Sequence, residues 1–111
     1  MANRITRGVA LLSSFRVGGG SLVKKISKGT IAIDPGNIAT VSRGAITWTL
    51  TGARAGDIVH MDPPATLNDD LIFCGTRVTA DDTVTVYLYN PTGGGIDDTS
   101  KTWDYLWIDL T

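Results

Sequence analysis

Apolar and polar positions alternate strictly along residues 83–89, where Val84, Val86 and Leu88 share one side. A period of two, in a stretch rich in β-branched and aromatic residues, predicts a half-buried strand. The next six residues, 90–95, read Asn-Pro-Thr-Gly-Gly-Gly and carry the chemistry of a turn. The sequence therefore predicts a strand that ends where the chain changes direction.

A second strand is predicted over residues 102–110, and both of its faces are apolar. Because a strand that ends a small chain cannot easily bury two apolar faces within one molecule, we expect one face to meet a partner. Tryptophan and tyrosine are favoured anchors of subunit interfaces, although a sandwich core would bury the same side chains. The residues that we expect to contribute to an oligomer interface are Trp103, Tyr105, Leu106, Trp107 and Ile108.

Shorter strands are predicted upstream, over residues 30–34, 45–51, 58–61, 71–74 and 77–80. Gly75 lies between the last two and is expected to form a bulge. Residues 35–37 are expected to turn, and residues 37–44 to form an edge strand or a loop. About seven short strands separated by Gly, Pro and Asp predict an all-β fold, either an antiparallel β-sandwich or a jelly-roll-like barrel.

Composition supports this fold class. The chain has 111 residues, enough for one domain, with thirteen Gly and eleven Asp but no Glu. No apolar run approaches the ~20 residues of a membrane span, and we expect no signal peptide. Cys74 is alone, so an intrachain disulfide is excluded and assembly in a reducing cytoplasm is the simplest interpretation.

Charge divides the chain into two parts. Residues 1–28 carry six cations and no acid, whereas residues 29–111 carry four cations and eleven Asp, a net charge of −7. We therefore expect a basic extended arm over residues 1–28, with a flexible Gly/Ser hinge at residues 18–21, and a β-sandwich domain over residues 29–111. The arm is either a disordered tail or a segment that becomes ordered against a neighbour. Direct nucleic-acid binding is not expected, because Phe15 is the arm's single aromatic residue.

Candidate catalytic residues are sparse. His60 is the single histidine, and Cys74 lies in an apolar strand, where a buried free thiol is commoner than a nucleophile. The Asp pairs lack the alternating spacing of a calcium loop, and Asp is ordinary in β-turns. Gly93-Gly94-Gly95 is not followed by the Lys-Ser/Thr of a phosphate loop. We expect no enzyme activity, no metal and no cofactor.

A series of strand and turn residues between residues 30 and 110 resembles a family of small virion proteins of tailed bacteriophages. It includes Ile33-Asp34-Pro35-Gly36, Gly56-Asp57-Ile58-Val59, Pro63-Pro64, Arg77-Val78-Thr79-Ala80, Asp82-Thr83-Val84-Thr85-Val86, Asn90-Pro91-Thr92-Gly93, Ile96-Asp97 and Thr102-Trp103-Asp104-Tyr105. The resemblance implies a capsid decoration (cement) protein that forms a homotrimer on the capsid exterior and fastens neighbouring capsomers of the major capsid protein.

Residues 1–28 lie outside the resemblance, and their role is a separate hypothesis. We expect them to reach over the major capsid protein through Arg4, Arg7, Phe15, Arg16, Lys24 and Lys25. The alternative function is a tail-fibre or receptor-binding β module, whose exposed Trp and Tyr beside Asp would bind host glycan. A glycan-degrading enzyme would need a convergent carboxylate pair, which the sequence does not single out.

Overall fold

Two segments of the chain run antiparallel to each other and form one long ribbon. The structure is a computed structural model that describes residues 14–111. The first segment contains β1 (Lys25–Ile33), β2 (Gly36–Ile38) and β3 (Ser42–Thr49). The second contains β6 (Thr83–Asn90), β7 (Ile96–Asp98) and β8 (Lys101–Asp109). β1 pairs with β8, β2 with β7 and β3 with β6.

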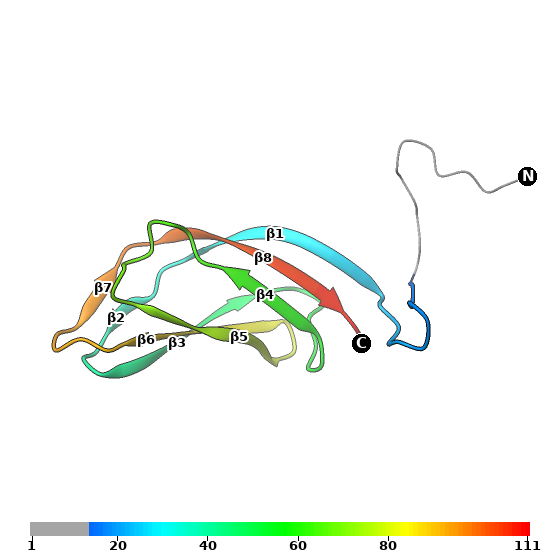
Figure 1. The fold of residues 1–111 in the computed structure, drawn as a ribbon, viewed down its shortest axis with the longest axis horizontal. Helices are drawn as coiled ribbons and strands as arrows, with labels where there is room; N and C mark the ends of the chain where they lie inside the picture. The colour runs from blue at the N-terminus through cyan, green and yellow to red at the C-terminus, as the bar shows by residue number, and fades with distance from the viewer. Residues whose placement is uncertain (1–13) are drawn as a thin grey trace, which may run out of the picture.

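This ribbon folds over at the short β2–β7 pair, so that its two ends face each other as two layers (Figure 1). β4 (Ile58–Asp62) extends one layer beside β8, and β5 (Ile72–Ala80) extends the other beside β6. The layers are thus β1-β8-β4 and β3-β6-β5. The predicted all-β, sandwich-like fold is confirmed: two three-stranded sheets form its layers, the two-stranded β2–β7 pair lies where the ribbon folds over, and the sheets of residues 14–111 do not close into a barrel.

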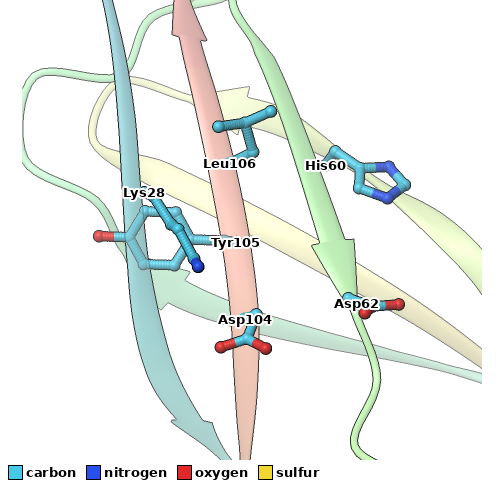
Figure 2. Close-up of a pocket in the computed structure, with 6 residues that line it drawn as sticks. All are labelled: Lys28, His60, Asp62, Asp104, Tyr105 and Leu106. Atoms are coloured by element: carbon cyan, nitrogen blue, oxygen red, sulfur yellow. The ribbon is translucent and has the colours of Figure 1, made fainter. Parts of the chain in front are cut away.

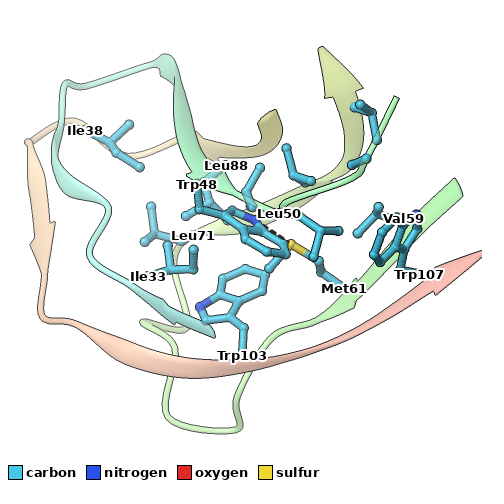
Figure 3. Packing of buried hydrophobic residues seen from close by; sticks show 14 residues of the cluster. Ile33, Ile38, Trp48, Leu50, Val59, Met61, Leu71, Leu88, Trp103 and Trp107 are labelled. Atoms are coloured by element: carbon cyan, nitrogen blue, oxygen red, sulfur yellow. Dashed lines mark hydrogen bonds between the residues drawn. The ribbon is translucent and has the colours of Figure 1, made fainter. Parts of the chain in front are cut away.

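The core lies between the two sheets (Figure 3). Val84, Val86 and Leu88 are fully buried there, as their alternation predicts. From the opposite sheet Trp103 enters the same space, and its ring lies 5.4 Å from that of Phe73 in an edge-to-face arrangement. Each fully buried large side chain contributes about 1.5–3 kcal/mol of transfer free energy, so this layer of aromatic and aliphatic groups is the main source of stability.

Several boundaries differ from the sequence predictions. β1 begins at Lys25, so residues 25–28, which were expected to belong to the arm, are part of the sheet. Residues 36 and 37, which were expected to turn, instead begin the strand β2, and its last residue lies in the range expected to form an edge strand or a loop. Gly36 adopts a positive φ, and β2 pairs with β7. The two predicted strands around Gly75 are one strand, β5. The predicted bulge is confirmed by the register shift there and by the φ of 114° at Gly75.

Candidate interaction surface

The outer face of the β1-β8-β4 sheet carries a row of isoleucines. Ile26 on β1 lies opposite Ile108 on β8, and Ile58 on β4 lies opposite the same residue from the other side. In the next row, Leu106 separates Lys28 from His60. Ile26, Ile58 and Leu106 are 53%, 51% and 37% exposed. We call Ile26, Ile58, Leu106 and Ile108 the apolar strip.

Polar residues border the apolar strip on one side. A shallow hollow of about 240 Å³ spans β1, β8 and β4 there, and Figure 2 shows the side chains around it. Its lining residues are Lys28, His60, Asp62, Asp104, Tyr105 and Leu106. The hollow is smaller than the ~300–1,000 Å³ of ligand pockets. An apolar centre with a polar rim is instead the arrangement of protein–protein interfaces.

Asp62 and Asp104 lie directly opposite each other on the neighbouring strands β4 and β8, at the edge of this hollow. Like charges in that position destabilise a sheet unless a counter-charge is near. Lys28 lines the same hollow from β1. The rim therefore offers both acidic and basic groups to a partner, next to an apolar surface.

The structure separates the predicted interface residues onto two faces of β8. Trp103 and Trp107 point into the core and are 1% and 4% exposed. The half-buried Tyr105 packs against Trp48, with 5.0 Å between ring centroids and 47° between ring planes. All three side chains lie in the core or pack against it. The expectation that Trp103 and Trp107 form an oligomer interface was wrong, because both are buried within one chain. The physical reason is that the β3-β6-β5 sheet covers the inner face of β8 within one chain. For the half-buried Tyr105, a place at an interface stays a prediction. Leu106 and Ile108 remain on the outer face.

Asp57 holds the C-terminal end of β8 in place through hydrogen bonds. Its carboxylate accepts hydrogen bonds from Trp107 Nε1 at 3.1 Å, from the Leu110 amide at 2.9 Å, from Thr111 Oγ1 at 2.9 Å and from the Arg54 amide at 3.1 Å. Burial opposes ionisation of Asp57, but these four donors hold the pKa of its carboxyl below its usual value. The position of Trp107, and with it that of the strand carrying Ile108, depends on this charge.

The predicted arm is partly attached to the body. Phe15 and Val23 form an antiparallel bridge around a turn closed by the hydrogen bond from the Gly20 amide to the Val17 carbonyl, 2.9 Å long. The Lys24 amide donates to the Asp109 carbonyl at 2.8 Å, and its ammonium donates to the Thr111 carbonyl. Lys25 Nζ lies 4.2 Å from the centroid of a Trp107 ring. Both lysines are therefore engaged by β8 and the C-terminal residues.

Two other predicted contact residues, Phe15 and Arg16, are exposed beyond the body, in the segment shown in dark blue in Figure 1. Arg4 and Arg7 lie outside the described residues. Whether any of these residues reaches a capsid protein stays a prediction.

The structure does not assemble the candidate catalytic residues into one site. His60 lines the hollow on the β1-β8-β4 sheet, whereas Cys74 belongs to β5 in the other sheet and its Sγ donates to the Ile72 carbonyl. Cys74 is exposed, contrary to the expectation of a buried thiol, because it precedes the bulge at Gly75 and points outward. Within residues 14–111, no three His, Cys, Asp or Glu side chains gather in a way that could hold a metal ion. No helix in that range could cross a membrane.

One member of each of two Asp pairs, Asp98 and Asp82, supports a loop. Asp98 accepts from Lys101 Nζ at 2.6 Å and from the Asn68 amide at 3.0 Å. Burial opposes its ionisation, but these bonds hold the pKa of Asp98 below its usual value. Asp82 accepts from the Gly52 amide at 2.7 Å and from Arg54 Nη1 at 2.8 Å, which lowers the pKa of Asp82. These carboxylates have structural partners.

The prediction from the sequence did not include two members of the apolar strip. Ile26 fell within the expected arm. Ile58 was predicted to lie in a strand, and alternation against the inward-facing Val59 could have placed it outside. Comparison of the chain with protein-family models, with curated proteins and with solved structures finds no match.

Proposed function

We propose that this chain is a structural protein of a tailed-bacteriophage virion, a capsid decoration protein that trimerises and fastens neighbouring capsomers of the major capsid protein. The proposal combines the resemblance of its strand and turn residues with one feature of the fold, the apolar strip. Three isoleucines in a single row on the outer face of a sheet contribute nothing to the core. Exposed, contiguous apolar side chains with a polar rim support binding to another protein surface.

The position of the apolar strip suits self-association. Ile26 is near the start of β1, where the basic N-terminal segment leaves the body, and Ile108 is near the end of β8 (Figure 1). Copies that meet through this end of the sheet bring their N-terminal segments together. Closed symmetry then presents several weak contacts at once, and linked contacts multiply into large avidity on a repeated surface.

Binding to capsid shells tests this function. The full chain is added to shells of the encoding phage that were assembled without it, and bound protein is measured by cosedimentation. We expect saturable binding in multiples of three copies and a higher temperature of shell disruption. Absence of binding at saturating concentration, with the chain still folded, would contradict the proposal.

Glycan binding is the alternative from a different functional class, and the structure weakens its premise. Trp103 and Trp107 are buried and cannot stack on a sugar. The half-buried Tyr105 beside Asp62 and Asp104 is what remains of the aromatic–carboxylate arrangement. Saturable binding of the full chain to one oligosaccharide class on an array, without binding to shells, would favour this alternative.

A further inference from the structure

The outer face of the second sheet, β3-β6-β5, carries two arginines on one tyrosine. Arg43 from β3 places its guanidinium carbon 4.7 Å from the centroid of the Tyr87 ring, and Arg77 from β5 places its own at 5.6 Å. Arg77 Nη2 also donates to Tyr87 Oη at 3.3 Å. The distances from the two guanidinium carbons to the ring centroid are both within the ~6 Å of a cation–π contact. The central strand thus holds one aromatic ring between cations from both edge strands.

In the part of the chain that the structure describes, neither guanidinium pairs with a carboxylate. The other two cations of residues 29–111 are paired, Arg54 with Asp81 and Asp82 and Lys101 with Asp98. Arg43 and Arg77 form no ion pair within residues 14–111, and residues 1–13 contain no acid. In a body with eleven Asp, two unpaired like charges on one ring repel each other and gain from a shared anion.

The space beside the ring can accept a small group. Gly75 lies opposite Tyr87 in the ladder, and its absent side chain leaves the neighbouring surface open. A hollow of about 290 Å³ lies at this place. Its lining residues are Arg43, Cys74, Gly75, Thr76, Arg77 and Tyr87. Guanidinium forks bind carboxylates through two parallel hydrogen bonds. A carboxylate in this hollow would lie near the guanidiniums of Arg43 and Arg77 and the phenol hydroxyl of Tyr87.

We propose that Arg43, Arg77 and Tyr87 form a binding site for acidic side chains of a protein partner. The site is on the opposite sheet from the apolar strip and does not depend on the self-association proposed above. A carboxylate is favoured over a nucleic acid because residues 29–111 carry a net charge of −7, which repels a polyanion. One or two carboxylates can be bound locally without that long-range cost.

The test uses the full chain labelled with ¹⁵N and a capped Gly-Asp-Asp-Gly peptide, with Gly-Asn-Asn-Gly as the neutral counterpart. We expect saturable amide shifts at residues 75–77 and 87 with the acidic peptide alone. In the double variant Arg43→Gln/Arg77→Gln the affinity should fall at least tenfold. Arg54→Gln removes one exposed, already paired cation from the same body and should change the affinity less than twofold.

Three results would overturn the proposal. These are equal shifts with the neutral peptide, an affinity unchanged in the double variant, and tighter binding of a single-stranded oligonucleotide at the same amides. The last would assign the site to phosphates. Arg43 and Arg77 are exposed, so the double variant should keep its spectrum elsewhere, and Tyr87→Phe offers a second variant that keeps the ring and removes the hydroxyl.

Discussion

Asp57 connects three parts of the chain through one carboxylate. The connection after β3, the indole of Trp107 and the two C-terminal residues all donate to it. A buried acceptor with four donors is costly to change, because each donor left without a partner loses its compensation for desolvation. The effect of one side chain therefore reaches the strand that carries the apolar strip.

Asp57→Asn should lower the free energy of unfolding by about 1–3 kcal/mol at neutral pH, because an amide replaces one acceptor by a donor facing Trp107 or Leu110. Urea denaturation at pH 7 measures this change. Asp69→Asn, at an exposed loop position, is the matched control and should leave the midpoint unchanged. Equal midpoints for the two variants would contradict the role assigned to Asp57.

The pH dependence of stability has a defined sign. The folded-state pKa values of Asp57 and Asp98 are depressed from 3.8, so their contributions are present above about pH 4 and are lost as the pH falls through the lower folded values. Urea midpoints measured from pH 6 to pH 2.5 should fall on the acid side. Asp57→Asn should flatten this decline, and a wild-type profile that rises toward low pH would contradict the account.

Gly29 is required because Tyr105 lies across β1 at that point. A Cβ on Gly29 would be 2.5 Å from Tyr105 Oη and 2.6 Å from Cζ. Since Trp48 packs against the Tyr105 ring, moving the ring disturbs the core. Gly29→Ala should therefore destabilise the protein by about 1–3 kcal/mol, the usual cost of overpacking.

Thermal unfolding compares this variant with Gly93→Ala, where a Cβ would have no atom within 4 Å. A melting temperature of Gly29→Ala at or above that of the Gly93→Ala control would show that the ring moves aside freely.

At the scale of elements, β1 determines where the body begins. Removing residues 1–23 leaves all nine residues of β1 paired with β8, whereas removing residues 1–28 deletes its first four and the contact of Lys25 with Trp107. At roughly 1 kcal/mol for each ladder hydrogen bond, the longer truncation should cost about 2–4 kcal/mol and the shorter one little. Urea midpoints of the two truncated chains would be equal if the arm extended to Lys28.

Alternation predicted the long strands well, including the edge strands β4 and β5, but it missed the start of β1 and the short strands β2 and β7. Val84, Val86 and Leu88 show a pure period of two, and the structure buries all three. β1 begins with Lys-Ile-Ser-Lys, whose residues read as a solvated arm because the strand is defined by its partner β8 rather than by its own pattern. β2 and β7 have three residues each, too few for any period. Both depend on the fold-over of the ribbon, which is a tertiary event.

The candidate surfaces were only partly predictable for the same reason. An apolar outer face on β8 was visible as Leu106 and Ile108, but the row that they complete with Ile26 and Ile58 requires the register of three strands. The Arg43–Tyr87–Arg77 cluster likewise joins three strands that are far apart in the sequence. Cross-strand sites are set by pairing, and pairing is what single-chain periodicity does not specify.

At the scale of the whole molecule, the two outer faces of the sandwich differ in chemistry. One carries the apolar strip, and the other carries two arginines that form no ion pair within residues 14–111. We propose that copies of the chain meet through the first face, which leaves the second face and the N-terminal segments available for a different partner. The proposed capsid-bound trimer would use both surfaces.

Light scattering of the full chain and two variants tests the role of the apolar strip most directly. Ile58 and Ile72 are the first residues of β4 and β5 and are 51% and 50% exposed, but they lie in opposite sheets. The account predicts a trimer for the wild type and for Ile72→Lys, and dissociation on dilution for Ile58→Lys. A monomeric wild type, or a trimer that survives Ile58→Lys on dilution, would contradict it.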